Sequence, residues 1–382
     1  MKIAQIAPLH ESVPPHAYGG TERVVHYLTE ALVAQGHEVT LFASGDSVTS
    51  AQLYPTVPEA LRLAPQRRDP LAWHLMQLAE IARLAGDFDV VHFHSDPLHY
   101  PLWRHISTPQ LTTLHGRLDL PDLKPLYTEF RDMPVVSISD HQRRPLPMAH
   151  WIGTVYNGLP PDRYTFRSQA GDYLAFLGRI SPEKGPESAI QIAIRTGLPL
   201  RMAAKVDPVD QEYFETRIRP WLDHPLIEFI GEVDEAGKDA LLGGALALLF
   251  PIAWPEPFGL VMTESMACGT PVIAFRRGSV PEVMADGVTG LVVEDLEQAV
   301  AAVGRIGEID RAACRAWFEE HFSAERMARG YTDLYGTLIA SRAEAVYDLP
   351  RAVRAHASHP EDRPSHQLLA YIHPAAGEEH PE

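Results

Sequence analysis

The feature that most constrains the fold of this chain is an alternation of apolar runs with amphipathic helical patterns. This alternation occurs in one series and then starts again in a second. The first series has apolar runs at 3–7, 38–43, 90–93, 110–114 and 135–138, and the second has runs at 174–177, 200–203, 227–230, 247–250, 271–274 and 290–292. Most runs are continuously apolar, which is typical of parallel strands covered by helices on both faces. This alternation predicts an α/β chain with two doubly wound, Rossmann-like sheets.

The restart also predicts where the domains divide. A chain of 382 residues suits two α/β domains better than one core. The turn-forming pairs Asn157-Gly158 and Pro160-Pro161 lie between the two series and mark a linker. We therefore predict a first domain at 1–160, a second domain that ends near 322, and a flexible tail at 343–382, which is rich in His, Pro, Glu and Ala.

Composition narrows the partners of the protein. The formal net charge of −17 disfavours non-specific binding to nucleic acid or to anionic lipid, although local basic clusters can still bind phosphate. The two cysteines, Cys268 and Cys314, provide no disulfide framework and no cysteine-based zinc site. No apolar run approaches the ~18 residues that a membrane span needs, and the N-terminus lacks a signal-peptide cleavage pattern. These features predict a soluble, cytoplasmic protein.

The most specific local segment is WPEPFGLVMTE at 254–264. It follows the strand predicted at 247–250 and leads into a helix expected to begin near Phe258. Ligands of α/β proteins bind at such junctions, where helix N-termini attract anions. Glu256 is expected in the loop and Glu264 about two turns into the helix, on the same side. The alternative is that both carboxylates only favour the helix start through its dipole.

A second segment, GRISPEKG at 178–185, places Arg179 and Lys184 after another predicted strand. A diphosphate leaving group needs cationic compensation, which arginine and lysine supply in different geometries. Two cations could therefore replace the divalent metal that many transferases use. The alternative is a solvated turn in which Lys184 pairs with Glu183 or Glu187.

Paired glycines, Gly19 and Gly20, lie between the first predicted strand and helix, and Thr21 is predicted to cap that helix. Glycines let a backbone approach a ligand closely, although the pair could form only a tight turn. The chain has no G-x-G-x-x-G sequence, so a nicotinamide or flavin dinucleotide cofactor is not predicted.

Three histidines follow or lie in apolar runs. His115 comes directly after the strand at 110–114, where its imidazole could donate a hydrogen bond to a sugar hydroxyl, or could be structural. We interpret His92 and His94 as facing opposite sides of their sheet and so as a poor metal-binding pair. Asp87 and Asp89 precede a strand and are interpreted as solvated turn residues. No metal site is predicted.

Four segments together resemble retaining glycosyltransferases of family 4, which have the two-domain GT-B fold. They are GGTERVV (19–25), LHG (114–116), GRISPEKG (178–185) and PEPFGLVMTESMACGTPVIAFRRGSVPEVM (255–284). They occur in the family's order within about residues 1–340. The resemblance implies two Rossmann-like domains facing each other across a cleft. The domain at 1–160 would bind the acceptor, the domain at 161–322 the nucleotide sugar, and a helix at 323–342 would return to the first domain.

The resemblance also implies roles for single residues. Glu256 and Glu264 fall on the family's E-x₇-E pair, which implies that the first contacts the donor sugar near the reacting carbon and the second the ribose. Arg179 and Lys184 match the diphosphate-binding pair, and His115 matches the histidine at the donor sugar. The implied catalytic set is Glu256, His115, Arg179 and Lys184, and the implied donor-binding set is Gly19, Gly20, Arg179, Lys184, Glu256, Phe258, Gly259, Leu260 and Glu264. Glu282, in a matching donor-pocket segment, is expected to be structural.

The activity implied is the transfer of a hexose, with retention and without a metal or other cofactor, from a nucleoside diphosphate sugar to a hydroxyl of a soluble acceptor. The segments AAKVDP and FPIAWPEPFGLVM also resemble UDP-glucose-dependent transferases, among them pterin glucosyltransferase-like proteins, which favours UDP-glucose. Two alternatives stay open: an epimerase or glycoside phosphorylase on the same fold, and a sugar-nucleotide-binding protein without activity. An apolar face predicted for a helix at 59–85 could touch a membrane, but core packing explains it as well.

Overall fold

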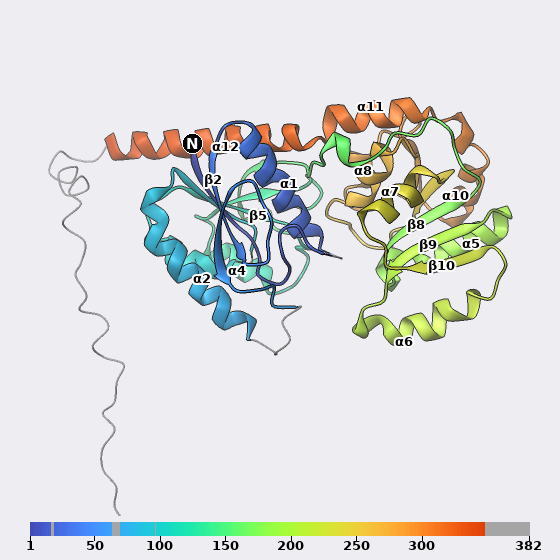
Figure 1. Cartoon of the computed structure of the whole chain (residues 1–382), viewed down its shortest axis with the longest axis horizontal. Helices are drawn as coiled ribbons and strands as arrows, with labels where there is room; N and C mark the ends of the chain where they lie inside the picture. Colours follow the sequence, from blue (N-terminus) through green and yellow to red (C-terminus); the bar gives the residue numbers. More distant parts are fainter. Residues whose placement is uncertain (17–18, 63–68, 96, 348–382) are drawn as a thin grey trace, which may run out of the picture. The chain divides into compact units, whose positions relative to one another are not determined.

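The computed structural model describes residues 1–16, 19–62, 69–95 and 97–347 (Figure 1). Two compact units divide these residues: Met1–Gly336, which holds both sheets, and a second unit from Thr337 onward. The tail predicted at 343–382 lies, from residue 348 onward, outside the described residues. Each sheet is entirely parallel, as predicted for two doubly wound sheets.

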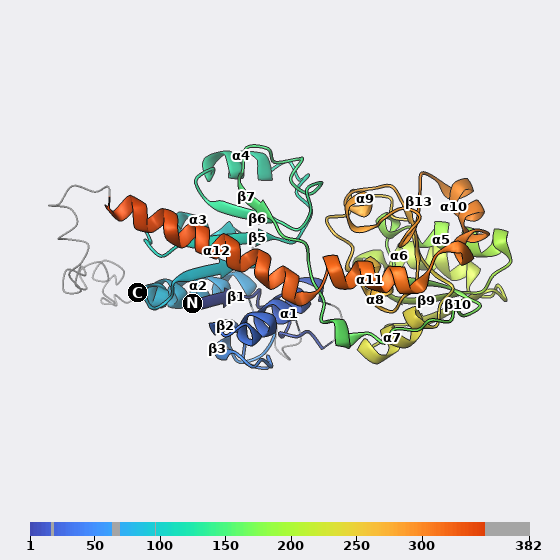
Figure 2. The ribbon, with the colours of Figure 1, turned by 90° about the horizontal axis from the view of Figure 1, so that it is seen from above.

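The first sheet has seven strands in the order β3-β2-β1-β4-β5-β6-β7, which Figure 2 shows from above with β3 at one edge and β7 at the other. Its strands are β1 (Lys2–Ile6), β2 (Glu38–Ser44), β3 (Gln52–Val57), β4 (Val90–Phe93), β5 (Gln110–Leu114), β6 (Pro134–Ser137) and β7 (His150–Thr154). The strand order reverses between β1 and β4, and such a reversal leaves a crevice at the carboxyl ends of the two strands.

The second sheet has six strands in the order β10-β9-β8-β11-β12-β13 and reverses between β8 and β11. Its strands are β8 (Leu174–Arg179), β9 (Leu200–Lys205), β10 (Ile227–Gly231), β11 (Ala247–Phe250), β12 (Val272–Phe275) and β13 (Gly290–Val293). The helices of the chain are α1 (Gly20–Ala34), α2 (Pro70–Leu84), α3 (Tyr100–Trp103), α4 (Leu123–Glu129), α5 (Pro186–Thr196), α6 (Gln211–Tyr213), α7 (Glu235–Gly243), α8 (Leu260–Ala267), α9 (Val280–Val283), α10 (Leu296–Val303), α11 (Arg311–His321) and α12 (Ala324–Tyr347).

Helices cover both faces of each sheet, which explains the continuous apolar runs. On one face of the first sheet, Leu78 and Ile81 of α2 pack with Ile6 and Phe93. On the other face lie α1 and, through Tyr331 and Tyr335, the first part of α12 (Figure 1). In the second sheet, α5 and α10 share one core with β8, β11 and β12, while α7, α8 and α11 lie on the opposite side (Figure 1).

Two edge strands, β3 and β7, were not predicted, and both are physically unusual. β3 contains Pro55, which is tolerated only at an edge because it cannot donate to a ladder. The sequence of β7 (HWIGT) includes Gly153, where an added Cβ would lie 3.1 Å from a side-chain carbon of Leu334. Half-exposed strands of this kind lack the continuous apolar character on which the prediction rested.

Three predicted helix starts are wrong. α1 begins at Gly20 after Gly19, so Thr21 lies inside the first turn and caps nothing. α2 begins at Pro70 rather than near residue 59, because Asp69 accepts a hydrogen bond from the Leu71 amide and proline favours the first helical position. Residues 63–68, part of the helix predicted at 59–85, lie outside the described residues. α8 begins at Leu260, so Glu264 stands one turn into the helix rather than two.

Candidate functional site

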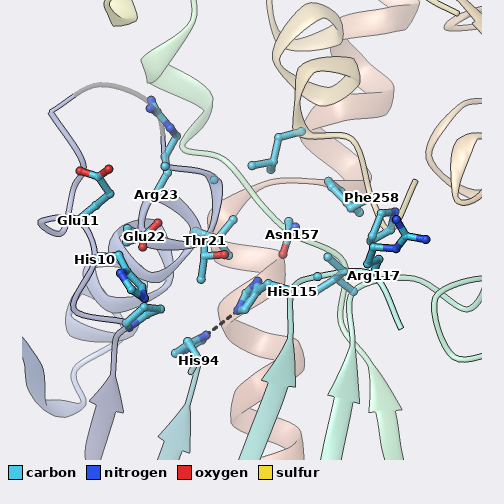
Figure 3. A pocket seen from close by; sticks show the side chains of 18 of the residues that line it. His10, Glu11, Thr21, Glu22, Arg23, His94, His115, Arg117, Asn157 and Phe258 are labelled. Atoms are coloured by element: carbon cyan, nitrogen blue, oxygen red, sulfur yellow. Dashed lines mark hydrogen bonds between the residues drawn. The ribbon is translucent and has the colours of Figure 1, made fainter. Parts of the chain in front are cut away.

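A pocket of about 910 Å³ opens within the unit Met1–Gly336 (Figure 3). Its walls are the segments that follow β1, β4 and β5 in the first sheet and β8 and β11 in the second. These include both positions where strand order reverses, as expected for an α/β ligand site. The pocket is lined by all ten residues of the catalytic and donor-binding sets that the resemblance implies, namely Gly19, Gly20, His115, Arg179, Lys184, Glu256, Phe258, Gly259, Leu260 and Glu264.

Lys184 and Glu256 form the central ion pair of the pocket. The Nζ atom of Lys184 lies 2.6 Å from Oε2 of Glu256, and the Trp254 indole donates to the same oxygen at 3.0 Å. The Lys184 ammonium also lies 5.4 Å from the centre of a Trp254 ring. Glu256 is 8% exposed. The solvated-turn alternative, with Lys184 paired to Glu183 or Glu187, is therefore wrong, because a lysine that follows β8 reaches the carboxylate that follows β11.

A close backbone contact holds these two loops together. The Ala253 amide donates to the Glu183 carbonyl at 2.8 Å. Gly185 has φ 70° and ψ 37°, in the left-handed region, and a Cβ added there would lie 2.1 Å from the Pro251 carbonyl oxygen. Glycine at this position permits both the backbone conformation and the approach. The close approach of the Lys184 and Glu256 loops therefore requires that residue 185 has no side chain.

The Glu256 backbone is held from its other side by the segment that precedes α9. The Ser279 amide donates to the Glu256 carbonyl at 3.0 Å, and the Ser279 hydroxyl donates to the Phe258 carbonyl at 2.9 Å. A Cβ at Gly278 would lie 2.3 Å from the backbone nitrogen of Glu256. The Glu282 carboxylate of α9 accepts hydrogen bonds from the backbone amides of Asp140 and His141, both at 2.7 Å. Its role in the structure is to hold this backbone segment.

Arg179 ends β8 among carboxylates. It forms an ion pair with Glu183, and its guanidinium lies 3.6 Å from Asp207 and 3.5 Å from Asp210. Desolvation raises the pKa of Asp210, although the charge of Arg179 opposes this shift. A phosphate bound at Arg179 would compete with these carboxylates for the guanidinium. The ion pairs of Arg179 should therefore rearrange when an anionic ligand binds.

Glu264 is buried and is paired through one of its carboxylate oxygens. Its Oε1 atom lies 3.0 Å from Nζ of Lys238 and accepts a hydrogen bond from the Tyr164 hydroxyl at 2.9 Å. Burial alone raises the pKa of Glu264, but the charges of Lys238 and Arg23 and the hydrogen bonds outweigh it and hold the pKa below 4.5. Sequence reasoning missed Lys238 and Tyr164, because neither belongs to a recognisable motif.

The pairing of Glu264 predicts an acid-sensitive contribution to stability. A carboxyl whose pKa is lowered in the folded state stabilises the fold above its unfolded pKa, and this contribution is lost as the pH falls through the folded value. We expect Glu264→Gln to lower Tm at pH 7, and the difference from wild type to shrink as the pH falls below 4.5. Melting curves from pH 7 to pH 3 measure this, with Glu320→Gln on the exposed face of α11 as the control. A difference independent of pH would contradict the ionised state of Glu264.

The histidines of β4 and β5 lie together, contrary to one expectation. The rings of His92 and His94 have centroids 3.9 Å apart, so the interpretation that they face opposite sides of the sheet is wrong. Residues two apart on a strand share a face. His94 Nδ1 lies 2.9 Å from His115 Nε2, as Figure 3 shows. Burial lowers the pKa of all three histidines, for His115 to about 4, so their rings are neutral at pH 7.

Asn157 is a pocket residue that had been interpreted only as a turn former. It is 3% exposed and lines the pocket. Its Oδ1 atom is buried and has no hydrogen-bond partner among the residues that the structure describes. Buried polar atoms are almost always paired, so this oxygen indicates where a ligand donor belongs.

The described residues contain neither a metal-binding cluster of side chains nor a helix that could span a membrane. Within 1–16, 19–62, 69–95 and 97–347, no group of three histidine, cysteine, aspartate or glutamate side chains is arranged to hold a metal ion. Over the same residues, every helix is too short or too polar to cross a bilayer.

Comparisons with known proteins agree with this geometry. The glycosyltransferase family 4 model matches residues 18–160, and the glycosyl transferases group 1 model matches residues 166–309. The first match contains every strand of the first sheet except β1, the second match contains the whole second sheet, and together they cover well over half of the chain.

The chain is also similar to known glycosyltransferases over most of their length. The chain is 27% identical to a glycogen synthase of Mycobacterium tuberculosis, over 83% of this chain and 86% of that protein. It is also 27% identical to a phosphatidyl-myo-inositol mannosyltransferase of Mycobacterium leprae, over 79% of this chain and 86% of that protein. The solved structure of AviGT4, a glycosyltransferase involved in avilamycin A biosynthesis, is 25% identical, covers 89% of this chain and 98% of its own, and gives a TM-score of 0.67. The chain is therefore a GT-B glycosyltransferase, with a family 4 domain followed by a group 1 domain.

Proposed function

We propose that this enzyme transfers a hexose, with retention, from a nucleoside diphosphate sugar to a hydroxyl of a small soluble acceptor, and that UDP-glucose is its donor. The observation that carries the proposal is the Lys184–Glu256 pair at the meeting point of the loops after β8 and β11. It places a mobile cation beside a buried carboxylate, as a reaction that separates an anionic leaving group from a positively charged sugar carbon requires.

In this proposal the donor diphosphate lies against Lys184, Arg179 and the start of α8. Binding of the diphosphate draws Lys184 away from Glu256, and Glu256 then faces the sugar. The bond between the anomeric carbon and the phosphate oxygen breaks, and charge develops on both sides of it. Glu256 stabilises the developing positive charge, and the acceptor oxygen attacks from the face that the diphosphate leaves. The acceptor proton passes to the departing phosphate oxygen.

The ribose is assigned to the group around Glu264. Its carboxylate is ionised and held by Lys238 and Tyr164. An ionised carboxylate accepts two hydroxyl hydrogens well, which suits the vicinal hydroxyls of a ribose. The acceptor is assigned to the wall formed by the first sheet. There Glu11, paired with Arg62 at 2.7 Å, and His74 provide polar side chains for a small polyhydroxylated molecule.

A donor panel tests the function. UDP-glucose, UDP-GlcNAc, UDP-galactose, GDP-mannose and ADP-glucose are each incubated with purified protein and EDTA, with and without a cell extract, and free nucleotide is measured by chromatography. We expect extract-dependent release of UDP from UDP-glucose despite EDTA. Release of nucleotide from GDP-mannose alone would show that GDP-mannose, and not UDP-glucose, is the donor. Release that stops with EDTA would contradict metal independence.

The same panel separates the other activities that this fold could support. An epimerase would convert the donor sugar without releasing nucleotide, and a phosphorylase would need added phosphate. Thermal stabilisation by a donor without turnover on any extract would indicate a binding protein and overturn the proposal.

A further inference from the structure

A chain of hydrogen bonds runs from His115, at the pocket, into the first sheet, and its direction follows from the orientation of the Gln5 side-chain amide. Gln5 of β1 donates through Nε2 to the hydroxyl of Tyr335 at 3.0 Å, which turns Oε1 of Gln5 toward His94. That oxygen lies 2.7 Å from His94 Nε2 and can only accept. His94 Nε2 therefore carries the hydrogen.

The tautomer of His94 determines the tautomer of His115. A neutral imidazole with a hydrogen on Nε2 has only a lone pair on Nδ1. His94 Nδ1 lies 2.9 Å from His115 Nε2, so His115 must donate there. The hydrogen of the neutral His115 ring is then committed to His94, and His115 Nδ1 is left as a hydrogen-bond acceptor in a residue that lines the pocket.

The far end of the chain is consistent with this direction. The Tyr335 hydroxyl accepts from Gln5 and lies 2.7 Å from His92 Nδ1, to which it donates. His92 Nε2 then donates to the Thr113 hydroxyl at 2.7 Å, and Thr113 donates to the Tyr331 hydroxyl at 2.9 Å. Each group donates once along the path, and no two hydrogens oppose each other.

We propose that Gln5 and Tyr335 are positioning residues that hold His115 in the Nε2–H tautomer, so that His115 Nδ1 accepts a hydrogen bond from a hydroxyl of the bound sugar. This reverses the donor role expected for His115 from the sequence. The buried, unpartnered Oδ1 of Asn157 supplies a second acceptor on the same pocket, as judged from the described residues. His115 Nδ1 and Asn157 Oδ1 both accept hydrogen bonds, so they favour a ligand with hydroxyl groups. They disfavour a carboxylate at this place, because a carboxylate has no hydrogen to donate. The inference rests on the proposed function only for the identity of the ligand.

The tautomer is measured on the free protein. Ring-nitrogen NMR shifts of histidine-labelled protein distinguish protonated from unprotonated Nδ1, and a His115→Ala sample assigns the signal. We expect wild-type His115 to have an unprotonated Nδ1. Tyr335→Phe removes the acceptor that orients Gln5, so the two tautomers of His115 should both be populated. Tyr331→Phe is the matched control: it lies one turn away on α12, is also fully buried, and removes only the last acceptor of the chain.

Activity gives the second readout. Tyr335→Phe should raise the KM for the donor about fivefold, as expected for one weakened hydrogen bond, with Tyr331→Phe near wild type. A protonated Nδ1 in the wild type, or an unchanged His115 signal in Tyr335→Phe, would overturn the proposal. The NMR measurement needs no substrate, so failure of the proposed function would leave the tautomer result intact. Equal losses of Tm in Tyr335→Phe and Tyr331→Phe would identify the part of the effect that comes from stability alone.

Discussion

Lys184→Ala is expected to lower kcat for donor consumption by about 10²–10³, the usual cost of removing a group that stabilises charge in a transition state. Nζ of Lys184 lies 2.6 Å from Glu256, on the side of the pocket assigned to the diphosphate. Its removal leaves the departing diphosphate without its mobile cation. It also removes the cation that pairs with the buried Glu256 carboxylate, which keeps its hydrogen bond from the Trp254 indole.

Initial rates of nucleotide release at saturating donor measure this effect, and nucleoside diphosphate binding should weaken in parallel. Lys124→Ala, on the exposed surface of α4, is the control for the loss of a lysine. Lys184→Arg should recover part of the rate, because it restores the charge but not the point geometry of an ammonium. Turnover of Lys184→Ala within about threefold of wild type would refute the leaving-group role.

The parts of the site that follow buried strands could be predicted from the sequence. Arg179 ends β8, His115 comes directly after β5, and Glu256 lies in the loop that follows β11. The carboxyl ends of parallel strands share one edge of a sheet. The sequence order of strand and motif was therefore enough to bring these residues to one pocket. The helix starts were less accurate, because they depend on single capping residues such as Asp69 and Gly259.

The partners of these residues could not be predicted. Gln5 meets Tyr335 across 330 positions, and Lys238 meets Glu264 from the neighbouring helix α7. Such contacts depend on the packing of helices against the sheets, which no local pattern records. The same holds for Asn157, whose buried oxygen becomes informative only when its surroundings are known.

Gly185→Ala is the second substitution with a large expected effect, and it tests whether the spacing of the loops that carry Lys184 and Glu256 sets the rate. The left-handed conformation of residue 185 costs a non-glycine residue about 1–2 kcal/mol. The larger consequence is steric, since the Cβ would lie 2.1 Å from the Pro251 carbonyl oxygen. The segment from Pro251 to Glu256 must then shift away from Lys184. A displacement of ~1 Å at reacting groups can lower a rate about 10²-fold, and we expect a loss of kcat of that order.

Gly197→Ala supplies the matched control, because Gly197 has φ 71° and ends α5, in the same left-handed region, but a Cβ there meets nothing within 4 Å. Both variants should lose stability from backbone strain, and Gly185→Ala should lose more because of its contact with Pro251, measured as the free energy of unfolding in urea. Only Gly185→Ala should also lose activity. Equal activity of the two folded variants would show that the loop after β11 tolerates displacement, and that the Lys184–Glu256 distance does not limit transfer. A loss confined to Gly185→Ala would instead make that backbone contact part of the catalytic apparatus, although it touches no substrate.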